Sequence, residues 1–261
     1  MVNFEYADHY GVDDLKKIVK VLRGPGGCPW DREQTHESIR RDLLEEAYEV
    51  ADAIDQSDPA NLKEELGDLL LQIVFHTDLE QEQNGLTLDD VADGVCKKLI
   101  YRHPHVFGEV TVSGTGEVLS NWETLKRAEK QQTTNTAALE GVARALPALW
   151  RAEKVQKKAA KAGFAWPDAE GAADKLTEEV GELRQAMAGS GDIEEELGDV
   201  LCAAVCLGRM LGVDPEGALN RATDKFIRRF RVVEELAGQR DMKQITPEEY
   251  FLLWQQAKQR T

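Results

Sequence analysis

Two groups of acidic residues recur in this 261-residue chain with the same internal spacing. In each group a Glu-Glu-x-x-Glu segment is followed, after a short break, by Glu-x-x-Asp. Because residues three or four apart share a face of an α-helix, the acids of each segment project together. Carboxylates held this close repel one another unless a proton or a cation neutralises them. The residues are Glu45, Glu46, Glu49, Glu65 and Asp68 in the first copy, and Glu178, Glu179, Glu182, Glu196 and Asp199 in the second.

The cation that best fits such a group is Mg²⁺, a hard ion that prefers oxygen ligands. Iron and zinc fit less well, because di-iron helical proteins use Glu-x-x-His and no histidine follows these glutamates at that spacing. His76 lies eight residues after Asp68, and a single histidine there is typical of a core or surface position. One isolated Glu-Glu-x-x-Glu would indicate a solvated helix face. The recurrence of the whole pattern favours a metal site.

A basic pair also recurs, downstream of each acidic group. Lys98 and Arg102 are four residues apart, and Lys225 and Arg229 repeat that spacing. Such a pair beside a metal would hold phosphate oxygens, although positive charge also favours an exposed helix C-terminus through the helix dipole. Acids for Mg²⁺ together with cations for phosphate predict a polyphosphate substrate. No Gly-x-x-x-x-Gly-Lys-Ser/Thr segment is present, so P-loop chemistry is not supported.

Each copy also contains a tryptophan with a lysine four residues on. Trp122 precedes Lys126, and Trp254 precedes Lys258. An indole ring offers a surface on which a nucleotide base can stack, but a tryptophan on an amphipathic helix is more often a core anchor. The corresponding landmarks of the two copies are separated by 127 to 133 residues and keep the same order, which indicates a duplication.

Helices with short connections position these residues. The apolar spacing predicts all-α structure, and Pro59 after Asp58 predicts a capped helix start before Glu65. We therefore predict two tandem domains of the four-helix-bundle type: residues 1–130, a polar linker over 131–137, and residues 138–261. The helices expected in the first domain span 11–22, 35–56, about 58–83, 86–103 and 121–130, with 104–120 as a loop. Those expected in the second span 146–162, 172–188, 192–211, 215–237 and 247–261.

The composition narrows the class of protein. Forty-eight Asp and Glu residues against 32 Lys and Arg residues give a formal net charge of −16, which disfavours nucleic acid as a partner. No apolar run approaches a membrane span, and no signal peptide begins the sequence. None of the four cysteines forms a Cys-x-x-Cys pair, and Cys202 and Cys206 are expected to be buried free thiols. These features favour a cytoplasmic protein.

Three longer segments carry a family resemblance over essentially the whole chain. They are GGCPWD (26–31), RHPHVFG (102–108) and ALPALWRAEKVQKKAAKAGFAWPD (145–168). Together with the acidic and basic motifs they resemble the tandem-domain MazG members of the all-α nucleoside triphosphate pyrophosphohydrolases. The second copy lacks a counterpart to HPHVFG, and Tyr101 stands where the second copy has Arg228.

The resemblance implies hydrolysis of a (d)NTP to the (d)NMP and pyrophosphate with broad base tolerance, assisted by Mg²⁺, for which Mn²⁺ can substitute. It also implies a cytoplasmic homodimer in which the second copy is the active one. The metal ligands would be Glu46, Glu49, Glu65 and Asp68, and Glu179, Glu182, Glu196 and Asp199. Glu45 and Glu178 would accept the proton of the attacking water, and substrate would be held by Lys98, Arg102, Lys225, Arg229 and Trp254.

Two other readings of the sequence remain open. The first is a narrow pyrophosphohydrolase specific for dUTP or phosphoribosyl-ATP, which a panel of nucleotides would separate from a broad one. The second is a non-catalytic helical module that binds a nucleotide or a partner protein without releasing pyrophosphate.

Overall fold

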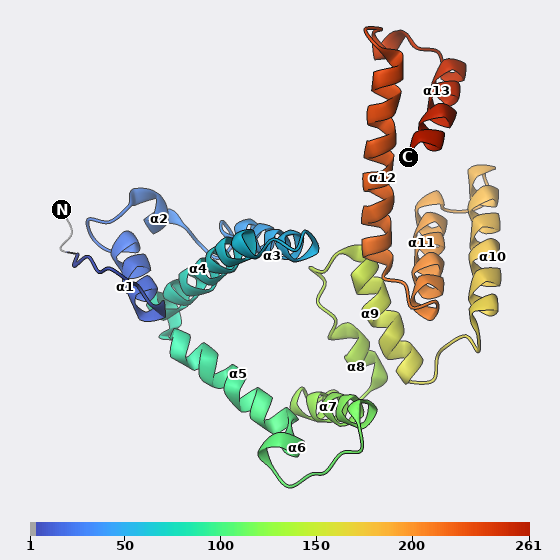
Figure 1. Ribbon diagram of the computed structural model, residues 1–261. Coiled ribbons are helices and arrows are strands. Elements are labelled where there is room, and N and C mark those ends of the chain that lie inside the picture. Colours follow the sequence, from blue (N-terminus) through green and yellow to red (C-terminus); the bar gives the residue numbers. More distant parts are fainter. Residues whose placement is uncertain (1–3) are drawn as a thin grey trace. The chain divides into compact units, whose positions relative to one another are not determined.

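The structure, a computed structural model, describes residues 4–261. These residues form α-helices and one short 3₁₀ helix and contain no strand, as Figure 1 shows. The chain divides into two compact units, Met1–Leu125 and Lys126–Thr261. The prediction of tandem all-α domains is therefore confirmed, while the linker at 131–137 stays a prediction. None of the described helices combines the length and the low polarity that crossing a membrane would require.

The first unit is built around a pair of adjacent helices, α3 and α4, joined by the turn 56–58. Asp58 caps α4 by accepting hydrogen bonds from the backbone N–H groups of Ala60 and Asn61, and Pro59 fills its first position. The helices are α1 (Val12–Arg23), α2 (Pro29–Glu33), α3 (Arg40–Asp55), α4 (Pro59–Asn84), α5 (Leu88–Arg102), α6 (Pro104–Phe107) and α7 (Thr115–Glu129).

In the core of the first unit, α1 packs against the second half of α4. Val19 of α1 packs with Val74, Phe75 and Leu79 of α4 and with Ile39, which precedes α3. This core lies beyond the acidic half of α4. The carboxylates of α4 therefore lie N-terminal to the buried core residues of this helix.

The expected loop over 104–120 is wrong. Pro104 begins the short helix α6, and α7 begins at Thr115, six residues before the helix expected at Asn121. Val118, Trp122 and Leu125 of α7 are spaced as one face of a helix. The prediction missed this spacing because the Gly and Val residues just before it favour a loop.

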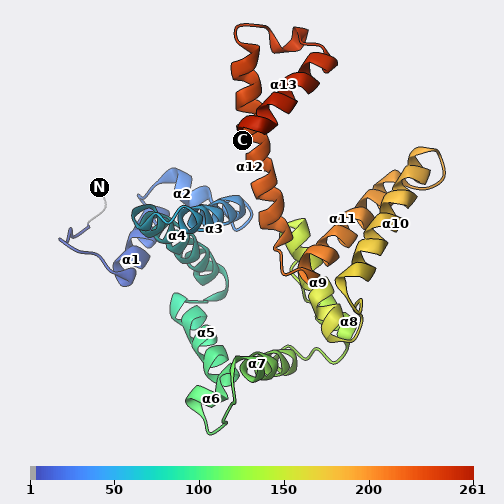
Figure 2. The same cartoon turned by 45° about the vertical axis from the view of Figure 1, so that its right-hand side comes forward.

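The second unit repeats the pair of adjacent helices as α10 and α11 and adds a second pair, α12 and α13 (Figure 2). Aspartates at 192 and 214 cap α11 and α12, and Thr246 caps α13 in a capping box with Glu249. The helices are α8 (Asn135–Glu140), α9 (Ala148–Lys161), α10 (Ala169–Met187), α11 (Ile193–Met210), α12 (Pro215–Ala237) and α13 (Pro247–Arg260), with a 3₁₀ helix at Met242–Gln244.

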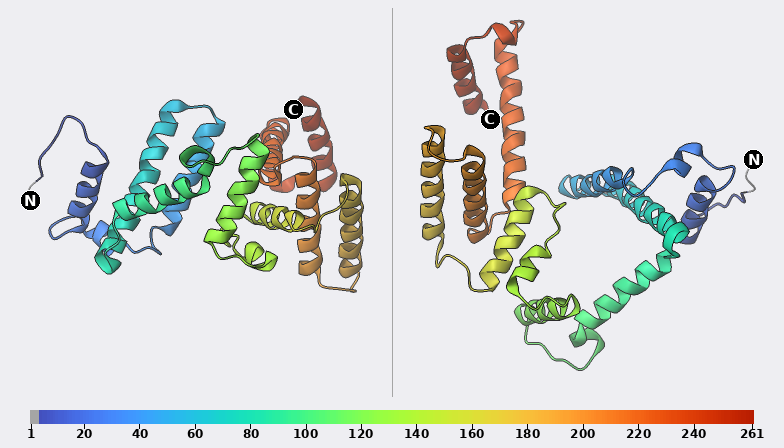
Figure 3. Two further views of the ribbon diagram at one scale, coloured as in Figure 1. Left: turned by 90° about the horizontal axis from the view of Figure 1, so that it is seen from below. Right: turned by 180° about the vertical axis from the view of Figure 1, so that it is seen from behind.

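The core described in this unit lies between α12 and α13. Val233 and Ala237 of α12 pack with Leu253 and Ala257 of α13 and with Ile245. In the second unit, therefore, this apolar cluster contains no residue of α10 or α11, whereas in the first unit it includes the second half of α4. Figure 3 shows α10 and α11 side by side in two further views.

Candidate metal and substrate site

The first acidic cluster joins α3 to α4. Glu46 and Glu49 from α3 and Glu65 from α4 each offer a carboxylate oxygen, and these oxygens all lie within 4.8 Å of one another. Asp68 lies one helical turn beyond Glu65, and its charge raises the pKa of Glu46. The two segments expected to converge do so, with Asp68 at the edge of the group.

Burial and neighbouring acids determine the electrostatics of Glu46 and Glu65 in this first cluster. Partial burial, Asp68 and Glu49 raise the pKa of Glu46 above its ordinary value. Partial burial, Glu49 and Glu64 do the same to the pKa of Glu65. Carboxyls whose pKa values are raised by their neighbours are stabilised by any cation that enters among them, so the cluster is a candidate cation site.

The second acidic cluster joins α10 to α11 in the same way. Oxygens of Glu179, Glu196 and Asp199 all lie within 4.8 Å of one another. Glu182 belongs to the edge of this group, because the neighbouring carboxylate of Glu179 raises the pKa of Glu182. Glu179 is only 6% exposed. Its Oε2 atom is buried and makes no hydrogen bond to any described residue.

A lysine that the sequence analysis missed lies against the second cluster. The Nζ atom of Lys175 lies 2.8 Å from Glu178 and 2.9 Å from Glu179. Its hydrogen bond lowers the pKa of Glu179, and the two acids raise the pKa of Lys175 itself. The spacing of three and four residues could have predicted these contacts. The corresponding position of the first copy is Asp42.

Neither expected proton acceptor belongs to the group of oxygens within 4.8 Å. Glu45 and Glu178 are exposed and immediately precede Glu46 and Glu179 on their helices. Glu178 is held by Lys175, whereas Asp42 stands at the corresponding position beside Glu45. Both therefore lie at the rim of the clusters, on the side from which solvent has access.

Cys202 also contacts the second cluster, and its expected burial is wrong. Cys202 is exposed and Cys206 is half-buried, and both are free. Cys202 follows Asp199 by one turn and so shares the acidic face of α11 instead of the core face. Burial of the sulfur and the charges of Asp199 and Glu179 raise the pKa of the Cys202 thiol.

The basic pairs lie on other helices. Lys98 and Arg102 are on α5, where the guanidinium of Arg102 lies 5.2 Å from the ring centre of Trp122. Lys225 and Arg229 are on α12, where Nε of Arg229 donates a hydrogen bond of 3.1 Å to Oγ1 of Thr261.

The structure brings the carboxylates of each cluster together but does not pair them with the lysine and arginine side chains of the basic pairs. Among the described residues, Lys98, Lys225 and Arg229 make no hydrogen bond or ion pair with the clustered acids. α5 leads away from the α3–α4 pair in Figure 1, and α12 packs chiefly against α13.

Trp254 occupies a structural position. Its ring lies 5.1 Å from that of Phe226, centre to centre, and it packs against the apolar cluster between α12 and α13. Arg229, one turn after Phe226, lies on the same side of α12. The indole is half-buried, so part of its ring remains exposed.

These features define a class of protein: an all-α protein with two copies of a helix pair, each carrying a cluster of carboxylates. The sequence matches the model of the MazG nucleotide pyrophosphohydrolase domain twice, over residues 34–107 and 169–233. Both acidic clusters fall inside the matched ranges.

Similar proteins of known name cover nearly the whole chain. The nucleoside triphosphate pyrophosphohydrolase of Escherichia coli strain K12 is 43% identical over 95% of this chain and 97% of its own length. The nucleoside triphosphate pyrophosphohydrolase/pyrophosphatase MazG of Thermotoga maritima is 42% identical over 94% of this chain and 95% of its own. A crystal structure of a mazG-related protein from Thermotoga maritima matches 44% of this chain with 30% identity and a TM-score of 0.38.

The chain therefore belongs to the MazG nucleotide pyrophosphohydrolase family, and the resemblance stated from its motifs is confirmed. It is an enzyme of the hydrolase class.

Proposed function

We propose that this enzyme hydrolyses (d)NTPs to (d)NMPs and pyrophosphate with Mg²⁺, accepts several bases, and so removes unwanted nucleotides from the nucleotide pool. The observation that carries the proposal is the Oε2 atom of Glu179. It is buried without a hydrogen-bond partner among the described residues, in a group whose oxygens lie within 4.8 Å of one another. A buried carboxylate oxygen without a donor is costly unless a cation fills the position.

The donor set fits Mg²⁺, with Mn²⁺ as the natural substitute, because every donor is a carboxylate oxygen. Glu179, Glu196 and Asp199 would hold the ion in the second copy, with Glu182 at its edge. When bound, the ion neutralises triphosphate charge and makes a neighbouring water more acidic.

The chain's own residues supply the remaining steps. Glu178, exposed beside the cluster, takes a proton from the water as its oxygen forms a bond to the α-phosphorus. The bond between the α-phosphorus and the oxygen that bridges to the β-phosphorus breaks, and pyrophosphate leaves with that oxygen. Lys225 and Arg229 bind the departing phosphates, and the exposed edge of Trp254 contacts the base. The first copy would use Glu45 and its own cluster in the same way, with Lys98 and Arg102 as the basic pair.

A homodimer would bring the basic pairs and the clusters together. Each acidic helix pair carries exposed apolar residues beside its carboxylates, among them Tyr48 at 50%, Leu66 at 49% and Leu201 at 48% exposure. Two helices cannot bury an apolar face on both sides, whereas two such pairs form a four-helix bundle. Association of two chains through these helix pairs would cover the apolar residues and place further side chains around each cluster.

Pyrophosphate release from a panel of canonical and modified (d)NTPs tests the function, with Mg²⁺, Mn²⁺ or EDTA present. Glu196→Gln and Glu65→Gln should remove activity from the second and the first copy respectively, without unfolding the helices. Glu195→Gln and Glu64→Gln are matched controls, because each changes the acid next to a proposed ligand, on a different face of the helix. Substantial turnover by the double variant Glu65→Gln/Glu196→Gln would contradict the site assignment.

Two outcomes would favour the other readings. Turnover confined to one nucleotide would indicate a narrow pyrophosphohydrolase. Binding of nucleotides without any pyrophosphate release would indicate a non-catalytic module. The oligomer is tested separately by sedimentation equilibrium, in which Leu66→Glu and Leu201→Glu should shift the mass toward that of a single chain.

A further inference from the structure

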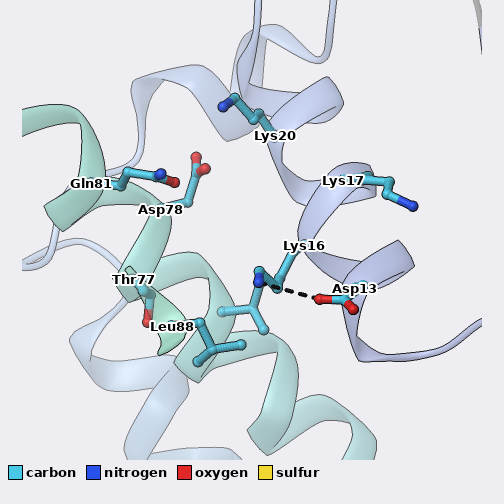
Figure 4. Close-up of a pocket in the computed structure, with 9 residues that line it drawn as sticks. Asp13, Lys16, Lys17, Lys20, Thr77, Asp78, Gln81 and Leu88 are labelled. Atoms are coloured by element: carbon cyan, nitrogen blue, oxygen red, sulfur yellow. Dashed lines mark hydrogen bonds and ion pairs between the residues drawn. The ribbon is translucent and has the colours of Figure 1, made fainter. Parts of the chain in front are cut away.

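The first unit contains a cavity that the proposed reaction does not use. It has a volume of about 380 Å³ and lies between α1, α4 and the first residue of α5 (Figure 4). A volume of this size falls within the range of small-ligand pockets. The lining residues are Asp13, Lys16, Lys17, Lys20, Val74, Thr77, Asp78, Gln81 and Leu88.

The cavity is separate from the first acidic cluster, although both use α4. Thr77 follows Glu65 by more than three turns of α4, which places the two residues about 18 Å apart along the helix axis. A ligand in the cavity therefore does not contact the carboxylates of the cluster.

Among the charged side chains that line the cavity, one lysine is not paired with an acidic side chain of any described residue. Asp13 is paired with Lys16 at 3.3 Å, and Asp78 is paired with the buried Arg23 at 2.8 Å. The two carboxylates that line the cavity thus already have their own partners. Among the residues that the structure describes, Lys20 has no acidic side chain within ion-pair distance, and Figure 4 shows its ammonium group on the side of Asp78 and Gln81.

The remaining lining divides into a polar and an apolar part. The side-chain amide of Gln81 makes no hydrogen bond to another described side chain and can donate to an anion. Val74 and Leu88 supply an apolar surface. Thr77 donates its hydroxyl proton to the carbonyl of Ile73 at 2.7 Å, so toward the cavity its oxygen can act only as an acceptor.

We propose that this cavity is an accessory binding site for a nucleoside monophosphate. The phosphate lies against Lys20 and Gln81, and the base lies over Val74 and Leu88. One cation without a counter-charge matches a single phosphate, whereas a triphosphate would bring several negative charges into a site that also contains two carboxylates. The choice of ligand rests on the proposed function, in which a nucleoside monophosphate is the product.

Binding of GMP and AMP to the intact protein in EDTA tests the proposal, by isothermal titration calorimetry. EDTA removes metal-dependent binding at the acidic clusters, and variants of Lys20 and Gln81 separate binding in the cavity from metal-independent binding at the basic pairs. Lys20→Gln should weaken binding at least about 10-fold, the effect of losing one hydrogen bond between charged groups. Gln81→Glu, which adds a carboxylate beside the phosphate, should abolish it.

Lys17→Gln is the matched control, since Lys17 is bound to Asp14 at 3.0 Å and its ammonium group points away from the cavity in Figure 4. Orthophosphate is a second probe and should bind more weakly than GMP, because it lacks the base. Neither Lys20→Gln nor Lys17→Gln should change the rate of NTP hydrolysis measured without added monophosphate.

Saturable GMP binding that Lys20→Gln weakens and Lys17→Gln does not would support the site. Failure of GMP and AMP to bind, or binding unchanged by both Lys20→Gln and Gln81→Glu, would overturn it. The outcome is independent of turnover: hydrolysis with Mg²⁺ but no binding in EDTA overturns the accessory site alone. Binding in EDTA without any hydrolysis would leave the site standing and overturn the proposed function.

Discussion

Replacing Arg23 with methionine should destabilise the first unit more than the substitution of any exposed residue on α1 does. The Arg23 side chain is only 4% exposed and donates Nε to Asp78 at 2.8 Å and Nη2 to Glu82 at 2.7 Å. It also donates Nη1 to the carbonyl of Asp31 at 3.0 Å and lies over the ring of Phe75. One side chain therefore ties α1 to α4 and to α2.

The magnitude follows from what each partner loses. Asp78 has a side chain only 11% exposed, so the loss of Arg23 leaves a nearly buried carboxylate without its cation. Breaking a buried ion pair from one side costs about 3–5 kcal/mol. Glu82 is 57% exposed, and its pair adds no more than about 1 kcal/mol. The buried pair therefore dominates, and Arg23→Met should cost at least about 3–5 kcal/mol.

Hydrogen–deuterium exchange resolves the first unit from the second in the intact chain. If α1 and α4 open together, a loss of about 3–5 kcal/mol speeds exchange of their slowest amides by about 10² to 10³·⁵-fold. Amides of α10 and α11 should be unchanged. Lys20→Met is the matched control, because it removes an exposed cation three residues away on the same helix and should change exchange by less than about 2-fold.

A second variant shows whether the buried charge is the cause. Arg23→Met combined with Asp78→Leu removes both charges, and replacing a buried pair by apolar side chains is often neutral. The double variant should therefore recover most of the stability lost in Arg23→Met. Exchange in Arg23→Met within a few-fold of the parent, or a double variant no more stable than the single one, would refute the reasoning.

Three further substitutions test the second acidic cluster, the histidine of α4 and one helix cap. Lys175→Met removes the ammonium group that pairs with Glu179 and competes there with Mg²⁺. At about pH 8 the variant should therefore reach half its maximal rate of pyrophosphate release at a lower Mg²⁺ concentration. An unchanged or higher Mg²⁺ concentration at half-maximal rate would contradict this. Burial and a neighbouring imidazole lower the pKa of His76, so protonation favours the unfolded chain and stability should fall as pH drops below about 6.5. In urea titrations His76→Gln should flatten this fall, and His9→Gln, at an exposed position, should not. Asp192→Ala removes the N-cap of α11 and should cost about 1 kcal/mol, seen as faster amide exchange in the first turn of that helix.

Local signals predicted most of the helices. Asp214 followed by Pro215 places an N-cap and a first helical residue side by side, and α12 begins at Pro215. Thr246 and Pro247 predict the start of α13 in the same way. These ends depend only on neighbouring residues, which is why one sequence suffices to locate them.

Contacts between distant segments could not be predicted. His36 precedes α3, yet its Nδ1 atom lies 2.8 Å from Nδ1 of His76 on α4. His76 was expected to be a solitary core or surface residue, and nothing in either local sequence identifies its partner. In the sequence, nothing distinguishes Arg23 from any other basic residue at the end of a helix, and its burial follows only from the packing of α1 on α4.

The two copies gather carboxylates on the same pair of helices but differ in which acids converge and in one charge, and the difference in charge bears on which copy is active. Lys175 lies against the second cluster and lowers the pKa of Glu179, whereas Asp42 stands at that position in the first copy. In the first cluster burial and the neighbouring acids raise the pKa values of Glu46 and Glu65, so these carboxyls take up protons at a higher pH than isolated glutamates do. Metal binding to the first copy should therefore weaken sooner as pH falls, because ligands must be deprotonated. The same charge that competes with Mg²⁺ at high pH thus keeps Glu179 ionised at lower pH, which favours the second copy as the one that works over the wider range.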